Sequence, residues 1–364
     1  MKCAYLYRAQ KYLNMALALS KDSKDPDARM LSQEKIGMYY HSTCQWDSSL
    51  RAYTKISKLA VKFGSKRYYD QSLTLMASWN HSKANFSREF KYAREGYEAN
   101  KKRGDYQQTV LATFYLAHAL ISADKSEEAI RLLKEEIKES LENQEFRDTI
   151  AKFCLTSLLA LSYVYARNLQ YVYDLIEESI HSMNPGVQPT FYGYTGYTAL
   201  IECCIVLYNS NPIEKIPLIV PYMKHLLHLL ERHSEIYPIS KCGFLYWKGS
   251  FHFLMRDKKG AFREWNKGLK LAENLDMPFE QALCLYAIGK NDKSNYETSE
   301  NYLDQAMKIF KKLGANHQLE AVKRKKREKH KFSGSLVFAN LKQHNQRNFE
   351  VMFKKKTDKP TEKV

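Results

Sequence analysis

Apolar residues recur along most of the chain at the three- and four-residue spacing of amphipathic helices. In NYLDQAMKIFKKLGANHQLEAV, residues 301–322, Leu303, Ala306 and Phe310 lie on one such stripe, and Gly314 follows where a helix ends. Only 14 Gly and 9 Pro occur in 364 residues, which is few for a fold rich in tight turns. The pattern therefore predicts an all-α protein.

A step of 40 residues repeats within this helical pattern. A large apolar residue stands before a small one at Ile36-Gly37, Met76-Ala77 and Leu116-Ala117, and the small residues Gly249 and Gly289 are separated by the same step. A second small residue follows after twelve positions, and a bulky one four positions later. These pairs are Ser49 with Tyr53, Ala129 with Leu133, and Ala261 with Trp265. Two antiparallel helices in close contact, joined by a short turn, explain both intervals.

The spacing resembles the tetratricopeptide pattern, and YWKGSFHFLMRDKKGAFREWNKGLKLAENL supplies Gly249, Ala261, Trp265 and Gly268 at its small and aromatic positions. The segment departs from the pattern at His252, and the period is 40 residues rather than roughly 34. We predict a right-handed superhelical solenoid of antiparallel helix hairpins, tetratricopeptide-like, with about 15 helices. Such a superhelix presents a concave surface on which its first helices hold a peptide or a neighbouring domain.

Composition along the chain predicts four parts. Residues 1–182 form a first block of helical repeats, 183–196 a Pro/Gly-rich loop or break, 197–321 a second block, and 322–364 a basic tail. The alternative for 183–196 is a long loop between two helices of one block. The first helix already carries the apolar stripe of an internal repeat, so we expect the chain to be a piece of a longer protein.

Most of the positive charge lies in the tail. The net charge is +17, and residues 322–364 hold 14 Lys or Arg against 4 Asp or Glu. The run KRKKREKHK, residues 323–331, is typical of a nuclear-import or polyanion-binding patch, and a solvated tail is the alternative. The apolar residues within 334–353 suggest a second role for the tail, which is to cover the exposed end of the repeat stack.

No sequence motif for chemistry stands out. A phosphate-binding loop, HExxH, GxSxG and paired metal-binding cysteines are missing. The nearest candidate is HLLHLLERH, in which His225 and His228 share a helical face, but a metal site needs a third or fourth ligand. We therefore interpret both as ordinary histidines and expect no catalytic, cofactor-binding or metal-binding residue.

The remaining composition indicates an intracellular protein. The seven cysteines are scattered without a CxxC pair, which fits reduced thiols. The opening residues lack an export signal, and the longest apolar stretch, TALIECCIVLY, is too short to span a bilayer. We expect a cytoplasmic location, with the nucleus as the alternative that the basic run suggests.

The end of the repeat region resembles a known family more closely. GAFREWNKGLKLAENLDMPFEQALCLYAIGK, followed by NYLDQAMKIFKKLGANHQLEAV, is similar to the C-terminal helical-repeat region of soluble adenylyl cyclase, with Ala261, Trp265 and Gly289 among the shared positions. The resemblance implies a family that makes cyclic AMP from ATP with two cyclase domains. None of the cyclase motifs occurs in this chain, so no catalytic residue is transferred.

The resemblance therefore implies a non-catalytic regulatory or scaffold region whose partner is another protein or a neighbouring domain of a larger chain. The competing hypothesis is a free-standing adaptor that binds nucleic acid or another polyanion through residues 323–331.

Overall fold

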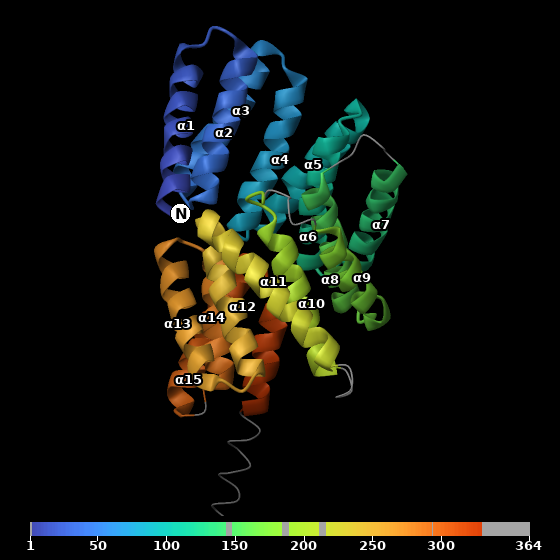
Figure 1. Cartoon of the computed structure of the whole chain (residues 1–364), viewed down its shortest axis with the longest axis vertical. Coiled ribbons are helices and arrows are strands. Elements are labelled where there is room, and N and C mark those ends of the chain that lie inside the picture. Colours follow the sequence, from blue (N-terminus) through green and yellow to red (C-terminus); the bar gives the residue numbers. More distant parts are fainter. Residues whose placement is uncertain (1, 143–147, 184–188, 211–215, 293, 330–364) are drawn as a thin grey trace, which may run out of the picture.

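The chain folds into antiparallel helix hairpins stacked in a superhelix (Figure 1). The computed structural model describes residues 2–142, 148–183, 189–210, 216–292 and 294–329, and these residues contain helices and turns but no strand. Neighbouring helices in the sequence pack against one another throughout. The predicted all-α, tetratricopeptide-like solenoid is confirmed.

The helices follow one another with short connections. They are α1 (Lys2–Asp22), α2 (Pro26–Ser42), α3 (Trp46–Phe63), α4 (Lys66–Ser82), α5 (Phe86–Arg103), α6 (Tyr106–Ser122), α7 (Ser126–Glu142), α8 (Thr149–Tyr165), η1 (Leu169–Tyr171), α9 (Val172–Ser182), α10 (Tyr194–Ser210), α11 (Ile216–Ile236), η3 (Pro238–Ser240), α12 (Lys241–Leu254), α13 (Lys258–Asn274), α14 (Pro278–Asn291) and α15 (Tyr296–Leu313). Residues 316–329 form a further helix. No helix in the described part of the chain is both long and apolar enough to cross a membrane.

The 40-residue step is built into the backbone of the first hairpins. Helices α2, α4 and α6 begin 40 residues apart, and so do α3, α5 and α7. The turn inside each hairpin contains one residue with a positive φ, which is Cys44, Ala84 or Asp124. Because the same turn geometry recurs at the same spacing, each hairpin presents equivalent positions to the next.

The small and bulky residues of the repeat meet within each hairpin. A Cβ atom added to Gly37 would lie 2.3 Å from a ring atom of Tyr53, and one added to Gly249 would lie 2.6 Å from two ring atoms of Trp265. Tyr53 is fully buried and Trp265 is 2% exposed. Glycine is therefore the residue that lets the two helices of each of these hairpins approach this closely.

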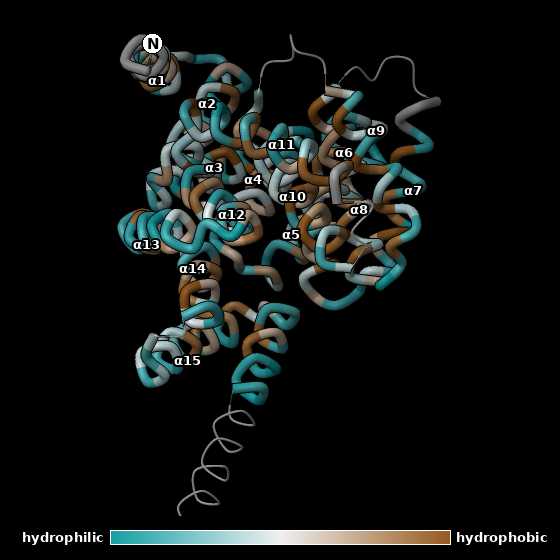
Figure 2. Tube along the Cα trace, turned by 60° about the horizontal axis from the view of Figure 1, so that its bottom comes forward, coloured by the Kyte–Doolittle hydropathy of each residue, from teal (hydrophilic) through white to brown (hydrophobic). Residues whose placement is uncertain are grey.

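The expected break does not separate two cores. Helix α10 begins at Tyr194, inside the segment 183–196, and packs directly against α8. A Cβ atom on Gly196 would lie 2.4 Å from the ring of Phe153, so the two helices touch closely. One apolar cluster joins buried residues from α3 to α13. Figure 2 shows hydrophobic residues concentrated on the inner helices, while α13 at the edge is mostly hydrophilic.

The superhelix brings its first hairpins against its last ones (Figure 1). The indole nitrogen of Trp46 donates to the carbonyl of Leu275 over 2.6 Å, and Lys83 Nζ lies 2.6 Å from Asp276 Oδ2. We call these two interactions the closing contact. Neighbouring interactions join the same parts, since the rings of Phe86 and Phe279 meet edge to face. Helices far apart in the sequence thus support each other, which a solenoid with only neighbour contacts does not require.

In the middle of the chain, the first helix of each hairpin belongs to the core. Every residue of α8 from Phe153 to Tyr163 is buried, and so are Ala112 to Ala117 of α6. Side chains of α10 fill the space beside them. In this part of the molecule the inner helix faces are therefore packed together, and they do not form the open concave surface that we expected for binding.

The described start of the basic run is helical and lies against the chain itself. Lys326 Nζ is 3.2 Å from Glu300 Oε2 and also contacts Asp304. Lys329 donates to the carbonyl of Gly289 over 3.0 Å and to Ser299. Residues 323–329 therefore extend the repeat stack, whereas 330–364, including the predicted cover 334–353, lie outside the described residues.

Candidate functional site

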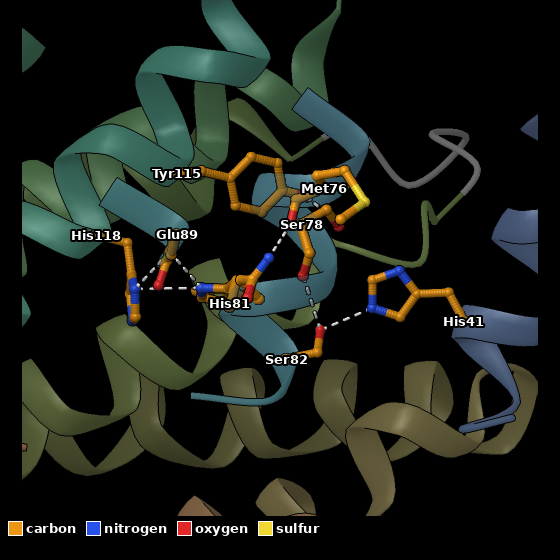
Figure 3. A network of polar contacts seen from close by, with 10 residues as sticks. His41, Met76, Ser78, His81, Ser82, Glu89, Tyr115 and His118 are labelled. Atoms are coloured by element: carbon orange, nitrogen blue, oxygen red, sulfur yellow. Dashed lines mark hydrogen bonds and ion pairs between the residues drawn. The ribbon is translucent and has the colours of Figure 1, made fainter. Parts of the chain in front are cut away.

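Three ionisable side chains from consecutive helices meet in the first block (Figure 3). They are His81 of α4, Glu89 of α5 and His118 of α6, and we call them the His-Glu-His cluster. His81 Nδ1 lies 2.9 Å from Glu89 Oε1, His118 Nδ1 lies 3.0 Å from the same oxygen, and the two ring nitrogens are 3.1 Å apart. The three atoms form a nearly equilateral triangle.

The repeat explains how these residues come together. Glu89 occupies the position that Ser49 and Ala129 hold in the neighbouring hairpins, facing the partner helix. His81 stands in the last turn of α4, next to the start of α5. Because α4, α5 and α6 pack side by side, these positions face one point. The cluster thus uses a place that the other hairpins fill with a small side chain.

The cluster is largely shielded from water. The side chain of Glu89 is 0% exposed, that of His81 8% and that of His118 20%. The rings of Phe86 and Phe114 pack against the two histidines. A carboxylate without contact to water needs compensating polar or charged partners. Among the three side chains, that of His118 is the most exposed to solvent.

Burial and mutual attraction fix the charges of the cluster. Burial opposes a charge on Glu89, but attraction to His118 and His81 outweighs it and lowers the pKa of Glu89 below its usual value. Burial, followed by repulsion from His118, lowers the pKa of His81 in spite of Glu89. At neutral pH the cluster therefore contains an ionised carboxylate beside an uncharged His81.

Two further observations concern atoms at the edge of the cluster. The second carboxylate oxygen, Glu89 Oε2, is buried and has no hydrogen-bond partner. The second ring nitrogen of His81, Nε2, lies 3.2 Å from Thr195 Oγ1 at the start of α10. Thr195 itself is 6% exposed. This contact connects the cluster with the second half of the chain.

A separate polar chain lies beside the cluster (Figure 3). His41 Nε2 is 2.9 Å from Ser82 Oγ, and Tyr115 donates to Ser78 Oγ over 2.9 Å. Burial, together with repulsion from His81, lowers the pKa of His41 to about 3. An uncharged His41 whose two ring nitrogens each have a hydroxyl partner, Ser82 and Tyr53, is a satisfied core residue.

The histidine pair considered from the sequence is not part of any cluster. His225 and His228 are exposed on α11, and no third ligand joins them among the described residues. The third histidine of that stretch, His233, is buried, with its ring nitrogens 2.8 Å from Ser240 Oγ and 2.8 Å from the Thr190 carbonyl. His233 therefore joins the end of α11 to the segment that precedes α10.

The cysteines are also structural. All six that are described with side chains are free and buried, and burial raises the pKa of each thiol, to about 12 for Cys44 and Cys204. A thiol that stays protonated is a poor nucleophile and a poor metal ligand.

Sequence reasoning missed the His-Glu-His cluster, although one signal for it exists. The small residue twelve positions after Gly37 and Ala117 has no counterpart after Ala77, because Glu89 stands there. A charged residue at a position that should be small and buried points to a specific partner. The helical pattern places His81 and His118 on the helices before and after the one that contains Glu89.

The fold defines the chain as an α-helical repeat protein. A comparison with protein-family models and with curated protein sequences finds no match for it.

Proposed function

We propose that this chain is a non-catalytic helical-repeat scaffold or regulatory region that binds a protein partner through the outer face of α1. The observation that carries the proposal is the exposure of that face. Tyr12, Met15 and Leu19 are 67%, 51% and 57% exposed, and their spacing places them on one stripe. Leu13, by contrast, is buried against α2.

The charges beside the stripe indicate the chemistry of its partner. On α1 the exposed apolar stripe is bordered by the exposed basic residues Arg8 and Lys11, and the first turn contains no acidic residue. An amphipathic helix of a partner, with acidic side chains beside its apolar face, complements this surface in shape and charge.

The experiment compares the wild-type chain with a Met15→Glu, Leu19→Glu variant. The matched control is Val61→Glu, which also replaces an exposed apolar side chain with a charged one, in this case on α3. Val61 is 68% exposed. Proteins cross-linked to each chain in cell extract are identified, and the contacting segment is made as a peptide and titrated by fluorescence anisotropy.

Two results together support the proposal: the peptide is an acidic amphipathic helix, and it binds wild type and the control at least tenfold more tightly than the α1 variant. Equal binding to all three chains contradicts the proposal. So does a concentration-dependent dimer that the α1 variant abolishes, because the stripe would then bind a second copy.

The role of such a scaffold follows from the resemblance to soluble adenylyl cyclase. We propose that the region regulates cyclase domains or holds them in place and makes no cyclic AMP itself. The absence of cyclase motifs from the sequence and the quoted repeat motifs support this. Formation of cyclic AMP from ATP by the purified chain contradicts it.

The polyanion adaptor stays an alternative prediction. Within residues 323–329, Lys326 and Lys329 are already engaged by the chain itself, which reduces the charge available to a ligand. Binding to nucleic acid that weakens steeply with salt, and that truncation after Val322 abolishes, would favour this alternative.

A further inference from the structure

The proposal concerns the His-Glu-His cluster, which the scaffold function does not use. Imidazole nitrogen and carboxylate oxygen together are the donors preferred by zinc and other first-row transition metals, whereas calcium and magnesium prefer oxygen alone. We propose that His81, Glu89 and His118 bind a divalent transition-metal ion of the Zn²⁺ class.

The distances fit a common ion. Ligand atoms that lie about 2.0–2.1 Å from Zn²⁺, at tetrahedral to octahedral angles, are about 2.9–3.4 Å from one another. The three edges of the cluster are 2.9, 3.0 and 3.1 Å. All three donor atoms are therefore at the separation of ligands that share one ion.

Hydrogen bonds alone do not satisfy the same triangle. A ring nitrogen carries either a proton or a lone pair in the ring plane. If both Nδ1 atoms are protonated, each can donate to the ionised Glu89, but the two N–H groups then face each other at 3.1 Å. If only one is protonated, the lone pair of the other lies beside the carboxylate oxygen. Every assignment with Glu89 ionised leaves one repulsive edge, and a cation removes it.

The surroundings prepare the ligands for a cation. In the tautomer whose Nε2–H donates to Thr195 Oγ1, the lone pair of His81 lies on Nδ1, toward the other two donors. The second carboxylate oxygen, Glu89 Oε2, is buried and has no hydrogen-bond partner, so it is also available to coordinate an ion.

A bound ion joins four helices. The ligands come from α4, α5 and α6, and Thr195 extends the connection to α10. Three protein ligands leave at least one position for water, and the partial exposure of His118 opens that position to solvent. The site is separate from the stripe on α1, so the metal proposal and the scaffold proposal succeed or fail independently.

The test uses Zn²⁺ as the probe. The full chain is freed of metal with a chelator, and Zn²⁺ is titrated against a fluorescent competitor, followed by elemental analysis of the dialysed protein. We expect one equivalent of Zn²⁺ in the wild type and at least a hundredfold weaker binding in His118→Gln and in Glu89→Gln. Thr195→Val, which keeps all three ligands, should bind about 10–100-fold more weakly.

The matched control is His225→Gln, His228→Gln, which removes two exposed histidines outside the cluster and should keep the full affinity. Circular dichroism shows whether each variant is folded. For a variant that does not fold, the replacement measurement is the spectrum of Co²⁺ bound to the wild type, which should show imidazole ligands. Absence of bound Zn²⁺ in the wild type, or its loss in the control variant, overturns the proposal.

Discussion

The close approach of Gly249 to Trp265 offers a sharp test of the hairpin packing. In Gly249→Ala the new Cβ atom would lie 2.6 Å from the Cδ1 and Nε1 atoms of Trp265 and 3.0 Å from the carbonyl oxygen of Ala261. The indole is 2% exposed and donates to the carbonyl of Tyr246, so it cannot simply turn away. Such overpacking costs about 1–3 kcal/mol.

The same helix contains the control. Gly243 also lies in α12, but a Cβ atom there would have a single neighbour, Thr198 Cγ2, at 3.7 Å. Replacing glycine by alanine inside a helix stabilises it by about 1 kcal/mol, and both variants gain this amount. The difference between Gly243→Ala and Gly249→Ala therefore isolates the steric cost. We expect Gly243→Ala to be the more stable by about 1–3 kcal/mol.

The assay is equilibrium unfolding in urea, followed by circular dichroism for wild type and both variants. Adding Trp265→Leu should make Gly249→Ala less harmful than it is in the wild-type background, because the colliding ring is gone. Equal unfolding midpoints for the two alanine variants would refute the packing that we describe for this hairpin.

Two further predictions concern other parts of the fold. Burial lowers the pKa of His233 to about 4 from an ordinary 6.5, so the unfolded chain binds its proton first as the pH falls, and the fold loses up to about 2 kcal/mol between pH 7 and pH 5. In His233→Gln this part of the loss should vanish, and an unchanged pH dependence of urea unfolding would contradict the assignment. Trp46→Phe removes the hydrogen bond to Leu275 and should cost about 1 kcal/mol. Amide exchange should then accelerate both in α3 and in the turn around Leu275, and acceleration in α3 alone would mean that the closing contact does not hold in solution.

Local patterns were sufficient to predict most of the fold. The helical stripes and the 40-residue step depend on residues close in sequence, and the structure confirms them. The closing contact was missed, because no sequence spacing indicates that Trp46 meets Leu275. The filled interior at α8 and α10 was also missed.

The candidate site was missed for a different reason. His81, Glu89 and His118 match no short metal motif, since each comes from a different helix and the spacing between them is set by the hairpin geometry. The pair that did attract attention, His225 and His228, has the spacing of one helix face but no third ligand from a neighbouring helix in the described chain. Side chains that converge across a repeat need the packing of three helices to be seen.

The closing contact also affects how the protein is made. Trp46 and Leu275 are separated by 229 positions, so a ribosome must synthesise most of the chain before the first hairpins can meet their final neighbours. Until then, the indole of Trp46 and the ring of Phe86 lack the surfaces that cover them in the finished molecule. Transiently exposed hydrophobic surface makes an incomplete chain prone to aggregation, and the last hairpins cover these aromatic rings.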